Sequence, residues 1–429
     1  MHVQDNTYTF VEGGVCAPLG FLAAGIHLGF RKNPERKDAG LVFSEIPETS
    51  AAAVFTQNVF CAAPVQISRE VAKTGHARAV ILNSGNANAA TGSAGLEAAH
   101  FAAETTAKEL SLKEEEVFVA STGVIGVSLP TEPYIEGLPK LAQNLGSSSE
   151  HAQAAASAIM TTDTHSKQCA VKFNIDGQTC TVGGMCKGSG MIQPNMATML
   201  AVLTTDAPVA QAALSIALKL AVNNSFNKVT VDSDTSTNDS VFLLANGAAG
   251  GKEITCSMQD CTKNATLDDI DLSNENESFI AFAKVLQAVC ENLARQIAAD
   301  GEGATKLVTV NVVGAVNKKD ADLAARAVAN SPLVKTAIAG HDCNWGRVAA
   351  ALGKSGAIFS QEKCDISFMG ICVCKSGLTQ NFDEDVALQK FEEPEIVIDI
   401  NLHAGHAKTR IWTCDLTHEY IHINADYRS

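Results

Sequence analysis

Aromatic side chains are scarce in this sequence. Its 429 residues include two tryptophans, four tyrosines and seventeen phenylalanines, so aromatics make up 5% of the chain, whereas 46% of all residues are hydrophobic. Alanine, valine, isoleucine and leucine must therefore fill the interior, which is typical of a layered α/β protein and unlike an aromatic-rich binding surface. The length is sufficient for two or three structural units.

Positive charge and long apolar runs are also in short supply. The net charge of −15 repels polyanions and anionic lipid, so we expect neither a nucleic acid nor a membrane as a partner. Gln211 and Lys219 interrupt the run at 209–222, the nearest approach to a membrane span. The first seven residues lack the basic and apolar regions of a signal peptide, which favours the bacterial cytosol.

Metal-binding and nucleotide-binding signatures are missing as well. The thirteen cysteines are scattered and contain no C-x-x-C, so we expect reduced thiols, no zinc site and no disulfide framework. Cys372 and Cys374 are expected to share one face of a strand. Gly188 follows Lys187, which excludes a Walker-type phosphate loop, and the carboxylates at 232–239 lack EF-hand spacing. We therefore expect no metal and no bound cofactor, and loop, cap or supporting roles for 232–239.

Strands and helices alternate along the chain, which predicts one compact, multilayer α/β unit. We expect strands at 79–82, 117–120, 200–203, 241–245 and 307–313, and helices at 96–110, 151–160, 279–297 and 320–330. Asp206 is expected to cap a helix that has Pro208 in its first turn. Residues 396–402 and 409–413 predict a hairpin, and the alternation at 421–424 predicts a final strand.

Polar residues gather where several of these strands end. The clusters lie at 83–88, 121–123, 161–164, 232–239, 300–303 and 342–347. Taken singly, each is more often turn chemistry, but several in one chain indicate a shared pocket. Thr122 and Gly123 offer a hydroxyl and a backbone N–H that could form an oxyanion hole, although a strand-ending turn is the commoner meaning of such a pair.

Thr198 lies in a glycine-containing segment near the middle of the chain. A threonine between apolar residues is ordinarily a core residue. The glycines permit unusual backbone angles, Pro194 restricts its predecessor and Lys187 supplies a cation, so the segment also suits a hydroxyl that attacks the preceding carbonyl. Cleavage of the Ala197–Thr198 bond would give Thr198 an α-amine of pKa about 7.7–8.0, a suitable base for its own hydroxyl.

Seven groups of residues resemble motifs of the arginine-biosynthetic ornithine acetyltransferases, the self-processing glutamate N-acetyltransferase family. They are KGSGMI at 187–192, MATML at 196–200, NSGNAN at 83–88, MTTDT at 160–164, DTSTND at 234–239, DGEGATK at 300–306 and NWGR at 344–347. The resemblance runs from residue 13 to the last residue and covers essentially the whole chain.

This resemblance implies both a fold and a reaction. The fold is a four-layer α/β/β/α sandwich, typically in an α2β2 assembly, with cleavage at Ala197–Thr198 into an α chain of 1–197 and a β chain of 198–429. Thr198 takes the acetyl group of N-acetylornithine, releases ornithine and passes the acetyl to glutamate by ping-pong kinetics. Thr122 and Gly123 match the family's oxyanion pair. The matching substrate-binding positions are Thr161, Lys187, Thr198, Glu302, Asn424 and Ser429.

The resemblance leaves some points open. We expect Lys187 to pair with a substrate carboxylate and Glu302 with an amino group; whether acetyl-CoA is also a donor, as in bifunctional members, is open. Departures from the family pattern are Cys343, His165-Ser166, Cys186 and Ala90, which bear on substrate preference rather than on reaction class. The alternatives are a self-processing amidase or aminopeptidase, in which water takes the acyl group, and an uncleaved small-molecule-binding protein.

Overall fold

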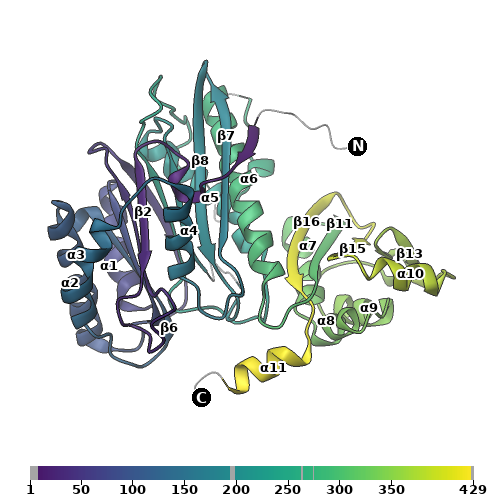
Figure 1. Cartoon of the computed structure of the whole chain (residues 1–429). Helices are drawn as coiled ribbons and strands as arrows, with labels where there is room; N and C mark the ends of the chain where they lie inside the picture. Colours follow the sequence, from purple (N-terminus) through teal and green to yellow (C-terminus); the bar gives the residue numbers. More distant parts are fainter. Residues whose placement is uncertain (1–7, 194–198, 262–263, 274, 427–429) are drawn as a thin grey trace. The chain divides into compact units, whose positions relative to one another are not determined.

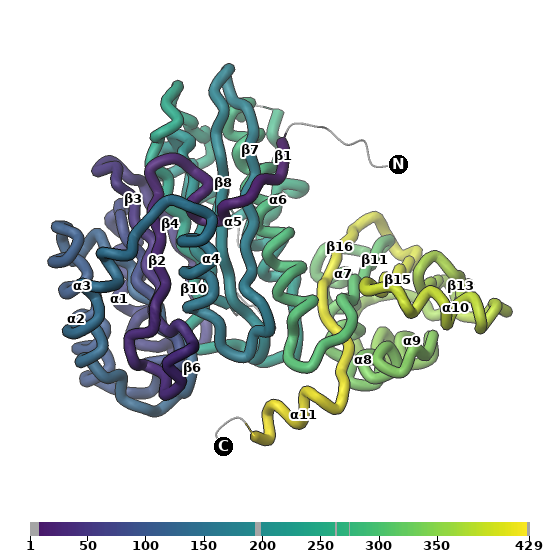
Figure 2. Tube along the Cα trace, viewed as in Figure 1, coloured from purple at the N-terminus to yellow at the C-terminus, as the bar shows by residue number. Residues whose placement is uncertain are grey.

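The computed structural model describes residues 8–193, 199–261, 264–273 and 275–426. Ala197, Thr198 and Ser429 lie outside these ranges. The chain divides into two compact units, which are described separately (Figures 1 and 2). Unit one comprises residues 1–188, 194–227 and 235–293, and unit two comprises 189–193, 228–234 and 294–429.

Unit one is built on two β-sheets. The larger has the strand order β1-β7-β8-β9-β10-β4, and the smaller has the order β2-β3-β5-β6. Only β9–β10 and β5–β6 are parallel among these described pairs. The strands are β1 (Tyr8–Val11), β2 (Phe21–Ile26), β3 (Ala39–Ser44), β4 (Ser50–Phe55), β5 (Ala79–Asn86), β6 (Val117–Val124), β7 (Lys167–Ile175), β8 (Gln178–Lys187), β9 (Leu200–Thr205) and β10 (Ser240–Ala245).

Helices cover both outer faces of this pair of sheets (Figure 1). Helices α2 (Gly92–Leu110) and α3 (Glu132–Gln143) pack on the smaller sheet. A second apolar core joins the two sheets and includes α1 (Ala63–Thr74) and α4 (Ser149–Ala158). Helices α5 (Gln211–Asn223) and α6 (Glu277–Ala299) cover the larger sheet, where Phe282 packs on Phe173. The order helix, sheet, sheet, helix confirms the expected α/β/β/α sandwich in unit one.

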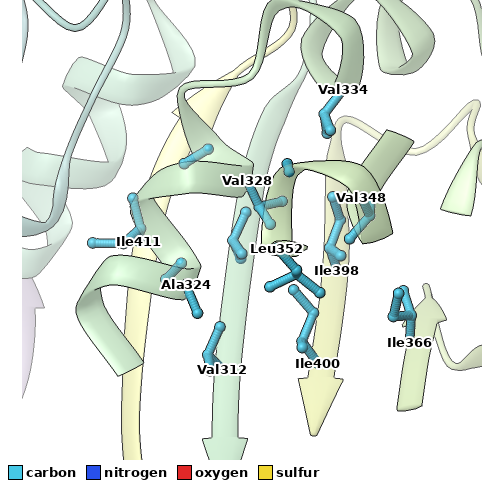
Figure 3. Close-up of a cluster of buried hydrophobic side chains, with 14 of the residues drawn as sticks. Val312, Ala324, Val328, Val334, Val348, Leu352, Ile366, Ile398, Ile400 and Ile411 are labelled. Carbon is cyan, nitrogen blue, oxygen red and sulfur yellow. The ribbon is translucent and has the colours of Figure 1, made fainter. Parts of the chain in front are cut away.

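Unit two contains one sheet of order β14-β13-β12-β15-β11-β16, with helices packed on it. Figure 3 shows strand residues such as Ile398 and Ile411 buried with the helix residues Val328 and Leu352. The elements are β11 (Leu307–Ala315), α7 (Lys318–Ala329), α8 (Pro332–Ala339), α9 (Trp345–Gly353), β12 (Asp365–Phe368), β13 (Ile371–Lys375), β14 (Leu378–Thr379), α10 (Glu384–Lys390), β15 (Glu395–Asn401), β16 (Ala407–Cys414) and α11 (His418–Ala425).

The strands and helices expected from residues 79 to 330 are present, with shifted ends. Two of these shifts bear on the polar clusters, because β5 and β6 continue through the polar residues that were expected to end them. Thr122 and Gly123 therefore lie inside a strand rather than after it. All thirteen cysteines are free, as expected. None of the described helices has the length and apolar character needed to cross a membrane.

Two predictions for the end of the chain are wrong. Strands β15 and β16 form no hairpin, because β11 lies between them, parallel to β15 and antiparallel to β16. Residues 421–424 belong to helix α11 rather than to a strand. The Thr417 hydroxyl accepts a hydrogen bond from the Glu419 N–H, and this local cap starts the helix despite the alternating pattern.

Two further predictions fail for local reasons. Asp206 caps no helix, because its carboxylate accepts hydrogen bonds from the backbone N–H groups of Leu19 and Thr181, and α5 begins only at Gln211. Cys372 is exposed whereas Cys374 is buried. The register of β13 against β12 is irregular at this point, so spacing by two does not place both thiols on one face.

Candidate functional site

The parallel strands β5 and β6 end side by side in unit one. In their ladder Ser84 pairs with Thr122, and Gly85 pairs with Gly123. Gly123 has a φ of 136°, and a Cβ at this position would overlap the Gly85 backbone, so only glycine allows this close approach. Thr122 and Gly123 are half-buried, and the Thr122 hydroxyl has no hydrogen-bond partner within the described residues. This strand end therefore offers an unused hydroxyl donor beside a re-oriented peptide, as an oxyanion hole requires.

Buried polar side chains fix the end of these two strands. The Asn83 Oδ1 accepts a hydrogen bond from the Ser121 Oγ at 2.6 Å, and its Nδ2 donates to the Asn86 carbonyl at 2.9 Å. Asn238 donates to the carbonyls of Ala87 at 2.6 Å and Ser121 at 2.9 Å. These satisfied buried groups hold the strand end in one geometry.

Asp163 links two of the expected substrate-binding positions in unit one. Its carboxylate accepts hydrogen bonds from the Thr161 N–H at 2.9 Å, the Gly188 N–H at 2.9 Å and the Lys167 Nζ at 2.7 Å. Burial alone would raise the pKa of the Asp163 carboxyl, but the charges of Lys187 and Lys167 and these hydrogen bonds hold it below its usual value. Lys187 is itself only 7% exposed. The structure thus brings Thr161 and Lys187 to one buried carboxylate.

Thr198, the expected nucleophile, lies outside the described residues, but the chain is described again from Met199. Lys187 ends β8, and its partner across the antiparallel ladder is Leu200, two residues after Thr198. The Met199 carbonyl accepts a hydrogen bond from the Ser240 N–H at 3.0 Å. The catalytic role of Thr198 stays a prediction.

Two arginines that the sequence analysis did not single out hold the Thr161 segment. The Arg31 guanidinium donates to the Met160 carbonyl at 2.5 Å and to the Ser84 Oγ at 3.2 Å. Arg36 donates to the Thr161 carbonyl at 2.8 Å. The sequence feature that could have pointed to these two arginines is the cluster of basic residues at 31–37 in an otherwise acidic chain.

Glu302 and Asn424 meet in unit two. The Asn424 Nδ2 donates to the Glu302 carboxylate at 2.7 Å, and the Glu302 N–H donates to the Ser189 carbonyl at 3.3 Å. A Cβ on Gly190 would overlap the Glu302 carboxylate, so the glycine leaves room for it. Glu302 is 7% exposed, yet it forms no ion pair within the described part of the chain. A carboxylate this buried is usually paired with a cation, which makes Glu302 a candidate ligand for one.

The surroundings of Glu302 are acidic. Asp232 accepts hydrogen bonds from the Met191 N–H at 2.6 Å and the Ile192 N–H at 2.8 Å, which is the supporting role expected for 232–239. Burial raises the pKa of the Asp232 carboxyl, and these hydrogen bonds only partly offset it. Burial, followed by the charges of Asp232 and Glu302, raises the pKa of Tyr420 to about 12. This arrangement favours an ammonium group and disfavours an anion.

Among the described residues, no group of three or more His, Cys, Asp or Glu could hold a metal ion.

Two of the departures from the family pattern are cysteines that are buried or half-buried. Cys186 lies in β8, where its Sγ donates to the Leu293 carbonyl at 3.8 Å. Burial raises the pKa of Cys343 to about 12, so this thiol stays protonated at neutral pH.

Comparison with known proteins gives a match over nearly the whole chain. Residues 22–429 match the model of the ArgJ family. The arginine biosynthesis bifunctional protein ArgJ of Caldanaerobacter subterraneus is 45% identical over 98% of this chain and 99% of its own length. The protein of the same name from Symbiobacterium thermophilum is 46% identical over 98% of this chain and 100% of its own length.

A solved structure matches part of the chain. The crystal structure of ornithine acetyltransferase complexed with ornithine from Mycobacterium tuberculosis is 43% identical, covering 44% of this chain and 100% of that chain, with a TM-score of 0.42. The full-length matches define the class of protein, an acyltransferase of arginine biosynthesis, as expected from the motifs. The chain belongs to the ArgJ family.

Proposed function

We propose that this chain transfers an acetyl group from N2-acetylornithine to glutamate, with Thr198 as the residue that carries the acetyl. The reaction class follows from membership of the ArgJ family. The observation that most directly supports this donor is the Glu302 carboxylate, which is nearly buried and has no ion-pair partner among the described residues. In N2-acetylornithine the α-nitrogen is an amide, so the side-chain ammonium is the only cation that can pair with Glu302.

Self-cleavage prepares the nucleophile in this proposal. The Thr198 hydroxyl attacks the Ala197 carbonyl carbon, and the peptide C–N bond gives way to an ester between the two residues. Water then hydrolyses the ester and leaves chains 1–197 and 198–429. The freed α-amine of Thr198, with an ordinary pKa of about 7.7–8.0, is a base for the regenerated hydroxyl.

Acetyl transfer then takes two matched steps. The Thr198 oxygen bonds to the acetyl carbon, the C–N bond to ornithine breaks, and the proton from the hydroxyl passes through the α-amine to the departing nitrogen. The nitrogen of the glutamate amine next bonds to the acetyl carbon, the ester C–O bond to Thr198 breaks, and the proton lost by the amine goes to the Thr198 oxygen. Thr122 and Gly123 stabilise the negative oxygen of both tetrahedral intermediates, a contribution of about 2.7–4 kcal/mol for each hydrogen-bond donor.

The remaining residues bind the substrates. Lys187, only 7% exposed, pairs with a substrate carboxylate. Thr161, Asn424 and Ser429 contact the bound amino acid, and Asn424 also orients Glu302 through their hydrogen bond. The reaction needs no cofactor, and acetyl-CoA is a second acetyl donor. The enzyme works as an α2β2 assembly in the bacterial cytosol.

Intact-mass spectrometry of purified full-length protein tests the central role of Thr198. We expect two chains for the wild type and for Thr198→Ser, which keeps a hydroxyl, and a single uncleaved chain for Thr198→Ala. Two chains in the alanine variant would show that another group cuts the bond. After cleavage, acetyl release should be much faster with glutamate than in buffer alone; equal rates would favour an amidase.

A further inference from the structure

Arg31 lies in the loop that joins β2 to β3, and a buried carboxylate holds the backbone of this loop (Figure 2). Asp38 is 0% exposed. Its carboxylate accepts hydrogen bonds from the N–H groups of Leu28 at 2.6 Å, Gly29 at 3.2 Å and Arg31 at 2.9 Å. Because a buried carboxylate with these bonds fixes the backbone around it, the direction in which the Arg31 side chain leaves the loop is also fixed.

The Arg31 side chain crosses the end of β5. A Cβ on Gly85 would stand 2.9 Å from the Arg31 Cγ, so the missing side chain at Gly85 gives the arginine stem its room. Beyond this point the Arg31 Nε donates to the Ser84 Oγ at 3.2 Å, and Ser84 is the ladder partner of Thr122. One side of the guanidinium is therefore fixed one strand away from the expected oxyanion pair.

The other side of the guanidinium holds a peptide group that is held from its opposite edge as well. The Arg31 Nη2 donates to the Met160 carbonyl at 2.5 Å. The N–H of the same peptide group belongs to Thr161, and it donates to the Asp163 carboxylate at 2.9 Å. A peptide group bonded at both its oxygen and its nitrogen cannot turn without losing a hydrogen bond, so the placement of Thr161 depends on Arg31 and on Asp163 together.

The same line of hydrogen bonds continues to Lys187. The Asp163 carboxylate also accepts a hydrogen bond from the N–H of Gly188, the residue after Lys187, at 2.9 Å. Arg31 therefore connects the end of β5 with both expected substrate-binding residues of unit one.

We propose that Arg31 is a positioning residue for acetyl transfer, which sets the spacing between the oxyanion pair, Thr122 and Gly123, and the substrate-binding residues Thr161 and Lys187. The inference rests on the proposed function and deepens it. The oxyanion donors must reach the acetyl oxygen while the amino-acid part of the substrate stays bound, so an error in this spacing slows the reaction although every contacting residue is present. Arg31 itself takes part in no bond change.

Kinetics of the cleaved full-length enzyme with two acetyl donors tests this role. Arg31→Met keeps the stem over Gly85 but removes both hydrogen-bond donors. We expect the kcat for N2-acetylornithine to fall about 100-fold, the loss that a misplacement of about 1 Å can cause, while its KM changes little. p-Nitrophenyl acetate has no amino-acid part, so it needs Thr198 and the oxyanion pair but neither Thr161 nor Lys187. The rate at which it releases p-nitrophenolate should be unchanged.

Arg78→Met is the matched control. Arg78 is also half-buried and lies before the start of β5, at the other end of that strand, where its guanidinium donates to the carbonyls of Ser44 and Glu45, both at 3.0 Å. Its loss should leave the kinetics of both donors unchanged. Arg31→Lys keeps the charge but not the planar fork that reaches two acceptors at once, so it should restore the rate with N2-acetylornithine only in part.

The outcomes separate this proposal from the proposed function. Equal losses with both donors in Arg31→Met would show that Arg31 supports the strand end as a whole, and unaltered kinetics with N2-acetylornithine would show that it is dispensable; either result overturns the positioning role. If Arg31→Met does not fold, Arg31→Lys serves for the same comparison of donors. A wild-type enzyme whose Thr198 is acetylated by p-nitrophenyl acetate but not by N2-acetylornithine would instead overturn the proposed function.

Discussion

The two units hold their candidate site residues by different means. In unit one Thr122 and Gly123 lie at the end of β6, and Thr161 lies in the loop between α4 and β7. Buried side chains such as Asn83 and Asp163 bond to the surrounding backbone. Cations balance the charge there. In unit two Glu302 stands on a loop, receives one side-chain hydrogen bond and has carboxylates rather than cations around it.

The two units therefore differ in how rigidly they hold their site residues and in whether the charges of those residues are balanced. The end of β5 and β6 is over-determined by its backbone ladder and its satisfied polar groups, so it suits a part of the site whose geometry must not change. The Glu302 region leaves a buried carboxylate without an ion-pair partner among described residues, so it suits a part whose charge is completed by a substrate. Each interpretation predicts its own response to substitution.

The largest expected effect comes from breaking the rigid strand end. In Gly123→Ala the new Cβ overlaps the Gly85 backbone and the residue must keep a φ of 136°, so the two strands have to separate. We expect acetyl transfer to fall by about 100-fold to 1,000-fold, the loss typical of one misplaced oxyanion-hole donor. Steady-state kinetics with N2-acetylornithine, beside a thermal melt, measures this.

The matched control for Gly123 is three residues away. Gly126 also has a positive φ, of 78°, but a Cβ there meets nothing within 4 Å. Gly126→Ala should therefore keep near-normal activity with a small loss of stability. Equal activity losses in the two variants would mean that backbone strain alone, rather than the approach of β6 to β5, explains the result.

The second-largest expected effect comes from removing the charge of Glu302, which has no ion-pair partner among the described residues. Glu302→Gln keeps the shape of the side chain but removes the charge that we assign to the ammonium of N2-acetylornithine. A charged hydrogen bond of about 1.5–3 kcal/mol corresponds to a rise of roughly 10-fold to 100-fold in the KM for that donor. The KM for glutamate should not rise, because the reacting glutamate offers no cation to this carboxylate.

Glu384→Gln is the control for this experiment. It removes an exposed carboxylate from α10 in the same unit and should change neither KM appreciably. A Glu302 variant with an unaltered KM for N2-acetylornithine would assign the ammonium to another residue.

The sequence predicts the rigid region better than the charged one. Apolar runs identified β5, β6, β9 and β10, because buried strands carry their signal locally. The pairing of β11 between β15 and β16 depends on contacts between distant segments. The apolar run of each strand looks the same in either arrangement. The alternation at Ile421 and Ile423 misled the prediction because the Thr417 cap, a local polar bond, decides the helix.

The candidate site divides in the same way. Motifs named Thr122, Gly123, Lys187 and Glu302, but they gave no role to Arg31, whose guanidinium fastens the Thr161 segment from another part of the chain. Such a bond joins residues 129 positions apart, and no periodicity or spacing encodes it. The absence of an ion-pair partner for Glu302 among the described residues likewise depends on which side chains fold around it.

The smallest effect concerns an ion pair that is only partly buried. In unit two Arg295 donates to both oxygens of Glu395, at 3.0 and 2.7 Å, and Thr309 donates at 2.6 Å. Burial would raise the pKa of Glu395, but these hydrogen bonds and the nearby positive charge hold it below its usual value. Because both side chains are about a third exposed, Glu395→Gln should cost at most about 1 kcal/mol at neutral pH.

The pH dependence follows from the sign of that shift. A carboxyl whose folded pKa is lowered stabilises the protein above its unfolded pKa, and this stabilisation disappears as the pH falls through the folded value. Urea unfolding of the wild type and the Glu395→Gln variant should therefore differ by a constant amount from pH 7 to about pH 5.5, and the difference should shrink as the pH falls below the ordinary glutamate pKa of about 4.3. A difference that grows on acidification would contradict the lowered pKa. It would also remove the contrast with Asp163, which forms a fully buried ion pair with Lys167. The pKa of Asp163 is also lowered, so the stabilisation from this pair should be lost on acidification in the same direction, and the loss should be larger.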